Sequence, residues 1–96
     1  MKNILWYLIA GTKGGITRGR MINCLHKKPS NANKLSELLA LDYKTVRHHI
    51  CVLEENNIIV SVNKGKYGAV YFLSDFMKEN ITDFEEIWKK IRANLE

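Results

Sequence analysis

The chain has 96 residues, of which 46% are hydrophobic and 26% charged, and its formal net charge is +5. This length allows one small domain, and the composition excludes a disordered or fibrous protein. Two cysteines without CxxC spacing exclude a disulfide framework or a zinc ribbon, so we expect a protein of the reduced cytoplasm.

Residues 1–10 form an apolar segment that we expect to be a helix, with a strand as the alternative. Its aliphatic side chains fall at helical spacing: Ile4, Leu5, Leu8 and Ile9. Trp6 and Tyr7 fill the other side, so the helix is apolar almost all round and must be covered. The run is too short to span a bilayer, and no A-x-A-like cleavage site follows it.

Residues 11–19 contain glycines that predict a connection. Gly14 and Gly19 have the spacing of a phosphate-binding loop, but Arg20 and Met21 occupy the positions where that motif needs Lys and then Ser or Thr. Without the lysine and the hydroxyl the nucleotide site cannot form, so the motif gives no support to a nucleotide enzyme.

Three helices are predicted between Thr17 and Asn57. The first covers 17–26, with Met21, Ile22 and Leu25 on its apolar face, and it ends before Pro29. Asn31 is expected to cap the second helix, whose apolar side chains are Leu35, Leu38 and Leu39. Ala40 and Leu41 connect it to the third helix, over about 42–57, which Asp42 is expected to cap.

The third helix has two contrasting faces. Val46, Ile50 and Leu53 recur at i, i+4 and i+7 and form a buried stripe flanked by His49. The side chains that project away from this stripe are Lys44, Arg47, His48 and Cys51, while Tyr43 and Thr45 lie in the exposed first turn. Two helices joined this tightly have the geometry of a helix-turn-helix whose second helix enters the DNA major groove.

The segments Leu35–Asp42, Lys44–Ile50 and Leu53–Val60 together resemble the winged helix-turn-helix transcription regulators, in particular the ArsR-like group. The resemblance covers roughly residues 17–73 and implies that the start of the recognition helix contacts bases. By position these residues are Tyr43, Lys44, Thr45, Arg47 and His48. Metal-sensing members carry two cysteines just before this motif, where this chain has Asn31 and Asn33, so their metal site is not inherited.

A β-hairpin is expected after the recognition helix. Residues 58–63 alternate with a period of two, 64–68 contain a glycine-rich turn, and 69–73 return as the partner strand. This hairpin is the expected wing, and its tip offers Lys64, Lys66 and Tyr67 for phosphate contact or minor-groove insertion. A merely solvated hairpin tip is the alternative. Lys34 and Arg20 are further candidates for phosphate contact.

The C-terminal segment is predicted to be a helix over 81–96, after a short link at 74–79. Thr82 and Glu85 have the spacing of a capping box, and one apolar face follows. Because residues 1–10 also carry excess apolar surface, we expect both segments to be dimerisation helices. The expected dimer residues are Ile4, Leu5, Trp6, Leu8, Phe84, Trp88, Ile91 and Leu95.

The side chains capable of chemistry are too scattered to predict an enzyme. His48 and His49 are adjacent and point about 100° apart on a helix, so they cannot chelate one ion together. His48 and Cys51 supply two ligands where a structural zinc needs about four. The sequence contains no apparent catalytic triad or carboxylate pair, so we expect no catalytic residue, metal or cofactor.

The charge is distributed unevenly, and this distribution favours a polyanionic partner. Residues 1–53 carry nine Lys or Arg against two acidic residues (9 − 2 = +7), whereas residues 74–96 carry four basic against six acidic residues (4 − 6 = −2).

The expected fold is α+β: a mostly helical winged helix-turn-helix with a two-stranded wing and additional terminal helices, in a single domain over 1–96. The expected function is sequence-specific binding of double-stranded DNA by a homodimeric transcription regulator. A protein-interaction module and an RNA-binding protein are the alternatives.

Overall fold

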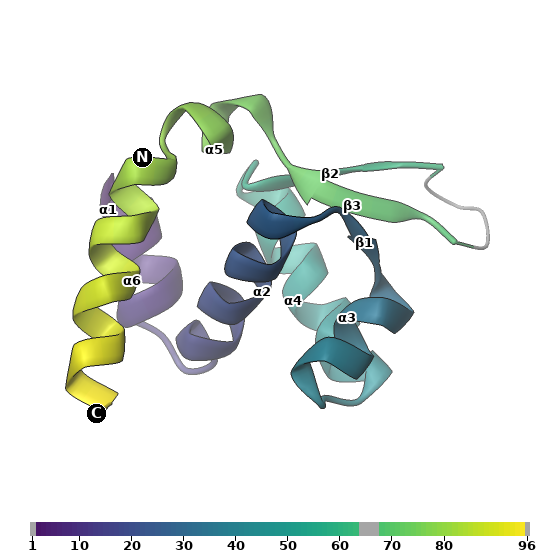
Figure 1. Ribbon diagram of the computed structural model, residues 1–96, viewed down its shortest axis with the longest axis horizontal. Helices are drawn as coiled ribbons and strands as arrows, with labels where there is room; N and C mark the ends of the chain where they lie inside the picture. The colour runs from purple at the N-terminus through teal and green to yellow at the C-terminus, as the bar shows by residue number, and fades with distance from the viewer. Residues whose placement is uncertain (1, 64–67, 96) are drawn as a thin grey trace.

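Helices dominate the fold, and a small sheet lies at one end of the molecule (Figure 1). The computed structural model describes residues 2–63 and 68–95. The elements follow in the order α1 (Lys2–Leu5), the π-helical turn η1 (Trp6–Ala10), α2 (Gly15–Lys27), β1 (Ser30–Asn31), α3 (Ala32–Leu39), α4 (Tyr43–Glu55), β2 (Ile59–Val62), β3 (Val70–Leu73), α5 (Asp75–Glu79) and α6 (Ile81–Leu95).

Helices α3 and α4 form the predicted helix pair. The Asn31 side chain caps α3 by accepting a hydrogen bond of 2.7 Å from the Lys34 backbone N–H. Ala40 adopts a left-handed conformation with φ 55°, which turns the chain within a few residues. The prediction that Asp42 caps α4 through its side chain is wrong, because only its backbone carbonyl accepts, from Val46.

The sheet confirms the wing hairpin and adds a strand that the sequence did not reveal. β2 and β3 pair antiparallel, with Ile59 opposite Leu73 and both buried against the helices. Ser30 and Asn31 form β1, which pairs with the other edge of β3 and gives the strand order β1-β3-β2. Pro29 follows the end of α2, so the chain is extended where it passes β3. The predicted wing-tip residues Lys64, Lys66 and Tyr67 lie outside the described residues.

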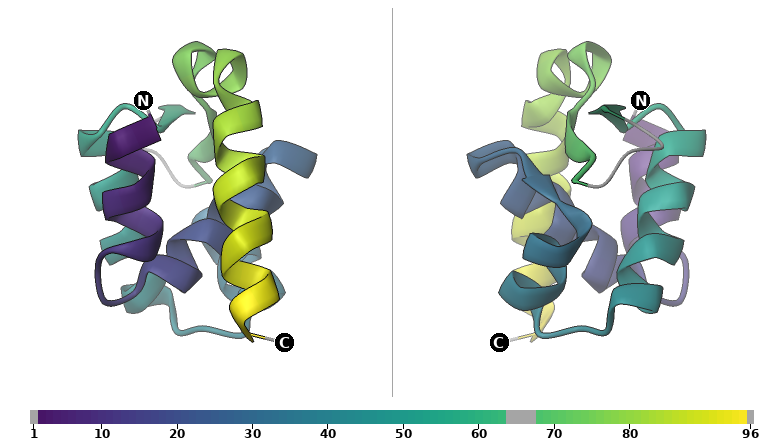
Figure 2. Two further views of the ribbon diagram at one scale, coloured as in Figure 1. Left: turned by 90° about the vertical axis from the view of Figure 1, so that its left-hand side faces the viewer. Right: turned by 90° about the vertical axis from the view of Figure 1, so that its right-hand side faces the viewer.

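The two terminal segments lie side by side at the end of the molecule opposite the wing (Figures 1 and 2). Lys2 Nζ lies 2.9 Å from Glu86 Oε2 in an exposed ion pair between α1 and α6. Phe84 and Trp88 stack on α6, and the Trp88 ring covers Gly19 of α2. The termini therefore extend the core of the winged unit.

This packing corrects the prediction of the dimer residues. The exposed fractions of Leu5, Leu8, Phe84 and Trp88 are 0%, 5%, 1% and 9%, so these side chains belong to the core of the chain itself. The sequence suggested a surplus of apolar surface because it did not show that the two segments cover each other.

The remaining predicted dimer residues have different environments. Trp6 and Ile91 line a groove between the terminal segments, and Ile4 is exposed. The side chain of Leu95 lies outside the part of the chain that is described.

One predicted helix start shifts, and one predicted helix cap is not formed. Helix α2 begins at Gly15, where a Cβ would lie 1.9 Å from the Ile9 carbonyl oxygen, so glycine permits a close approach to η1. Helix α6 begins at Ile81, so Thr82 lies in its first turn and is not the expected cap. The Asn80 carbonyl accepts from the Asp83 N–H instead, because α5 runs almost directly into α6. None of the described helices is long and apolar enough to cross a membrane.

Candidate nucleic-acid interface

Helix α4 presents a polar surface opposite its buried stripe. Val46, Ile50 and Leu53 are fully buried against the rest of the chain, as the sequence predicted. On the other side Lys44, His48 and Cys51 are exposed, Tyr43 is half-exposed at the first position of the helix, and Thr45 is partly buried. The second helix of the pair therefore offers cationic and hydrogen-bonding side chains to a partner, as a recognition helix must.

Arg47 lies at the boundary between this surface and the wing. Its Nη1 donates a hydrogen bond to the hydroxyl of Tyr71 on β3, and the guanidinium is partly buried. This hydrogen bond raises the pKa of Arg47 above its ordinary value. Tyr71 is buried, so the sheet holds one end of the arginine in a fixed place. The guanidinium has further N–H donors that can bind a second partner.

Tyr71 is a functional candidate that the sequence did not identify. Alternation along β3 does place it on the buried face between Val70 and Phe72. A buried tyrosine hydroxyl usually needs a hydrogen-bond partner, and this rule could have prompted a search for a nearby donor. The identity of that donor depends on the packing of β3 against α4, which the sequence does not reveal.

Arg18 of α2 anchors helix α4 through His49. This arginine of α2 is 5% exposed, and its Nε donates a 2.7 Å hydrogen bond to the Leu8 carbonyl. Its Nη2 donates to the hydroxyl of Thr12 and, at 3.4 Å, to the carbonyl of Lys13. Its Nη1 lies 3.3 Å from Nδ1 of His49 on α4. One guanidinium thus connects η1, the loop before α2 and helix α4.

The Arg18–His49 contact constrains the protonation of His49. The imidazole nitrogen accepts from the guanidinium only when it carries no proton. Burial lowers the pKa of His49, and the charges of Arg18 and His48 lower it further. Burial also lowers the pKa of Arg18. His49 is 7% exposed and accepts the Arg18 hydrogen bond in its neutral form, and its ring meets the His48 ring edge-on at 5.2 Å.

The predicted phosphate-contacting side chains have mixed environments. Lys34 is exposed near the start of α3, with Glu37 Oε2 3.9 Å from its Nζ. Arg20 is exposed too, and its Nη2 donates a 3.3 Å hydrogen bond to the Leu39 carbonyl at the end of α3. Both remain available to a polyanion.

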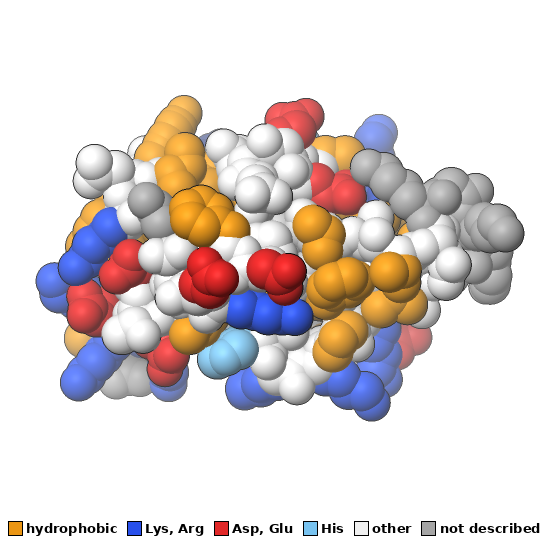
Figure 3. Space-filling view, turned by 90° about the horizontal axis from the view of Figure 1, so that it is seen from above, with side chains coloured by type: hydrophobic (Ala, Val, Ile, Leu, Met, Phe, Trp, Pro, Cys, Tyr) orange, Lys and Arg blue, Asp and Glu red, His pale blue; other side chains and the backbone are white. Residues whose placement is uncertain are grey.

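The face above α5 contrasts with the polar surface of α4. Figure 3 shows acidic, basic and hydrophobic side chains next to one another on this side of the molecule. On α5 itself Asp75, Phe76 and Glu79 are exposed, and Lys78 Nζ lies 5.7 Å from the centre of the Phe72 ring. Because the charges there have both signs, this face suits a polyanion less well than the start of α4 does.

A metal site needs several ligand side chains that lie close together. Within residues 2–63 and 68–95, no three His, Cys, Asp or Glu side chains come together in a way that could hold a metal ion. His26 lies on α2, where it lines a hollow together with residues of α6, whereas His48 and Cys51 lie on α4.

Solved structures of other proteins have similar folds. The chain superposes on a transcriptional regulator homologue from Pyrococcus horikoshii OT3 with a TM-score of 0.63 and 26% identity, covering 86% of each chain. The fold is a winged helix-turn-helix. Two mutants of ZitR from Lactococcus lactis match with TM-scores of 0.59 and 0.58 at 19% identity, over 80% of this chain and 57% of theirs. This chain thus spans little more than half the length of ZitR. No family model and no curated protein matches the chain.

Proposed function

We propose that this protein is a sequence-specific, DNA-binding transcription regulator that places α4 in the major groove. The observation that supports this most strongly is the exposed row of Lys44, His48 and Cys51 on the second helix of a helix pair, with Arg47 held beside it. The similarity to a Pyrococcus transcriptional regulator homologue supports the same function.

Each exposed side chain has a proposed role in reading the duplex. Lys44 and Arg47 have donors that suit guanine O6 and N7, whereas Tyr43, Thr45 and His48 contribute polar or methyl contacts. Lys34, Arg20 and the wing lysines at 64 and 66 contact phosphates, and Tyr67 accompanies them at the wing tip. The whole chain acts as a single DNA-binding domain of ArsR-like type, without a catalytic residue.

Dimer formation belongs to the same proposal, with a smaller interface than the sequence suggested. Ile4 and Tyr7 are 38% and 55% exposed, and at helical spacing they share one flank of the first segment. We place the contact between two copies there. A two-fold axis would set two recognition helices one DNA turn, or a multiple, apart.

Sedimentation equilibrium tests the dimer. We expect the wild type to be dimeric at micromolar concentration and an Ile4→Glu, Tyr7→Glu variant to be monomeric and folded. Leu38→Glu, an exposed position on α3, is the matched control and should leave the mass unchanged. A monomeric wild type would remove the dimer from the proposal.

Fluorescence anisotropy with a labelled mixed-sequence duplex at several salt concentrations tests the DNA-binding function. Affinity should fall steeply with salt, because each neutralised phosphate contributes a slope of about −0.9 in log–log form. Lys44→Gln should weaken binding, whereas Lys89→Gln on α6 should not. No binding at low salt would favour a protein-interaction module, and preference for single-stranded RNA would favour an RNA-binding protein.

A further inference from the structure

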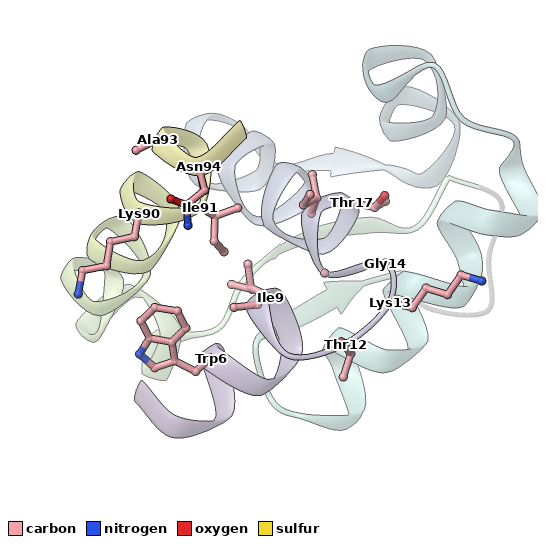
Figure 4. A pocket seen from close by; sticks show the side chains of 13 residues that line it. Trp6, Ile9, Thr12, Lys13, Gly14, Thr17, Lys90, Ile91, Ala93 and Asn94 are labelled. Carbon is pink, nitrogen blue, oxygen red and sulfur yellow. The ribbon is translucent and has the colours of Figure 1, made fainter. Parts of the chain in front are cut away.

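The groove between the terminal segments has the walls of a small-molecule site. It measures about 910 Å³ and lies between η1, the start of α2 and the last turns of α6. Figure 4 shows Trp6, Ile9 and Ile91 converging from two helices, with the Asn94 amide beside them. Ligand pockets have this composition of apolar walls and a few polar groups, and typical volumes are about 300–1,000 Å³.

The charged side chains that line the groove have one sign, and outside the lining the Glu86 carboxylate also interacts with Lys90. Lys90 Nζ lies 5.7 Å from the centre of the Trp6 ring, at the mouth of the groove. Lys13 also belongs to the lining, although Figure 4 shows its side chain pointing away from the cavity. The described lining residues include no Asp or Glu. An apolar occupant with one negative group therefore fits both the walls and the charge.

From this geometry we infer that the groove binds a small apolar carboxylate. Its hydrocarbon part lies between Trp6, Ile9 and Ile91, and its carboxylate faces the ammonium group of Lys90 at the mouth. A second copy of the chain fits less well, because the proposed dimer contact uses Ile4 and Tyr7, which are not among the residues that line the groove.

The groove is also connected to the recognition helix. Thr12 and Lys13 line it, and the Thr12 hydroxyl and the Lys13 carbonyl both accept hydrogen bonds from Arg18, which contacts His49. At Gly14 the loop runs so close to α4 that a Cβ would lie 2.9 Å from His49 Cε1. An occupant that shifts this loop therefore displaces the anchor of α4. This coupling rests on the proposed DNA-binding function.

Titration with sodium octanoate, followed by Trp fluorescence and calorimetry, tests the site. Trp6 lines the groove and Trp88 is buried, so we expect a saturable signal that Trp6→Phe abolishes while calorimetric binding persists. Octan-1-ol should bind more weakly than octanoate. The absence of saturable octanoate binding would overturn the site, and equal binding of alcohol and carboxylate would overturn the assignment of the ligand class.

Matched variants locate the binding. Lys90→Gln should weaken octanoate binding about fivefold, as expected for a partly exposed ion pair, whereas Lys89→Gln, one residue earlier and outside the groove, should not. Ile16→Glu, an exposed residue of the lining, should abolish binding, and Leu38→Glu on α3 should have no effect. If wild type is dimeric and Ile16→Glu alone makes it monomeric, a second copy occupies the groove and the inference fails.

The coupling has its own readout. Saturating octanoate should change the dissociation constant of a bound duplex by about fivefold or more, and less in an Arg18→Lys variant. An unchanged constant, with octanoate binding demonstrated, would overturn the coupling alone. If wild type does not bind a duplex in the absence of octanoate, the proposed function is contradicted instead. The two failures are therefore distinguishable.

Discussion

Arg47 combines a proposed base contact with a fixed position, because the Tyr71 hydroxyl accepts a hydrogen bond from it. We expect Arg47→Ala to weaken binding to the preferred duplex by about 1–3 kcal/mol and to relax preference at one base pair. Tyr71→Phe, which removes only the acceptor, should relax the same position to a smaller extent. Competition binding against duplexes altered at single positions measures both effects.

Lys44→Ala is the comparison for this prediction, since Lys44 is exposed and no hydrogen bond joins it to the described residues of the sheet. It should relax a different base pair. If Arg47→Ala weakens binding to preferred and random duplexes equally, Arg47 contacts phosphate and does not read a base.

His49 should make the stability of the protein depend on pH. Its pKa in the folded protein lies below the ordinary value of 6.5, so the unfolded chain binds a proton more readily than the folded one. The stabilisation is therefore complete above pH 6.5 and disappears as the pH falls towards the folded pKa. Urea unfolding between pH 5 and 8 measures this dependence.

A His49→Gln variant should lose most of this dependence, whereas His26→Gln, an exposed position on α2, should retain it. Stability that rises on acidification from pH 7 to 6 would contradict a neutral His49 beside Arg18.

At the scale of elements, Gly19 sets how closely α2 and α6 approach. A Cβ there would lie 2.2 Å from the Trp88 ring, which is too close for any real contact. We expect Gly19→Ala to destabilise the fold by about 1–3 kcal/mol through overpacking, although alanine favours a helix. Thermal unfolding measures it, and the cost should shrink in a Trp88→Leu background. If the destabilisation by Gly19→Ala and that by Trp88→Leu simply add in the double variant, α2 and α6 do not meet at this position.

The wing is the second element with a distinct expectation. Replacing Lys64 and Lys66 together with alanine should weaken binding to all duplexes alike and reduce the salt slope by about one unit for each phosphate that the variant no longer neutralises. Salt titrations of wild type and variant provide the measurement, with Lys89→Ala as the control. An unchanged slope would remove the wing from the interface.

The elements whose signals are local could be predicted from the sequence. The stripe of Val46, Ile50 and Leu53 and the period-two pattern after Ile58 predicted α4 and the wing, and both are confirmed. Strand β1 could not be predicted, because two residues carry no periodicity and pair only through contact with β3. The Arg47–Tyr71 and Arg18–His49 contacts join residues 24 and 31 positions apart, so they depend on packing.

For the molecule as a whole, the terminal helices show why excess apolar surface in the sequence does not by itself predict a dimer interface. Leu5, Leu8 and Phe84 carried the prediction of a large dimer interface, yet they are buried in one chain. Each such side chain contributes about 1.5–3 kcal/mol when buried, whichever chain covers it. The sequence indicates the surplus but not the partner that covers it, so the oligomeric state has to be measured.

Selection of bound sequences from a random duplex library tests whether α4 reads DNA bases. If α4 reads bases from a two-fold dimer, wild type should enrich an inverted repeat with half-sites one helical turn or a multiple apart. A Lys44→Ala, Arg47→Ala variant should enrich no such motif, and Lys89→Ala should enrich the wild-type motif. Base reading by α4 would be contradicted if wild type enriched nothing above background, or if the double variant enriched the same motif as wild type.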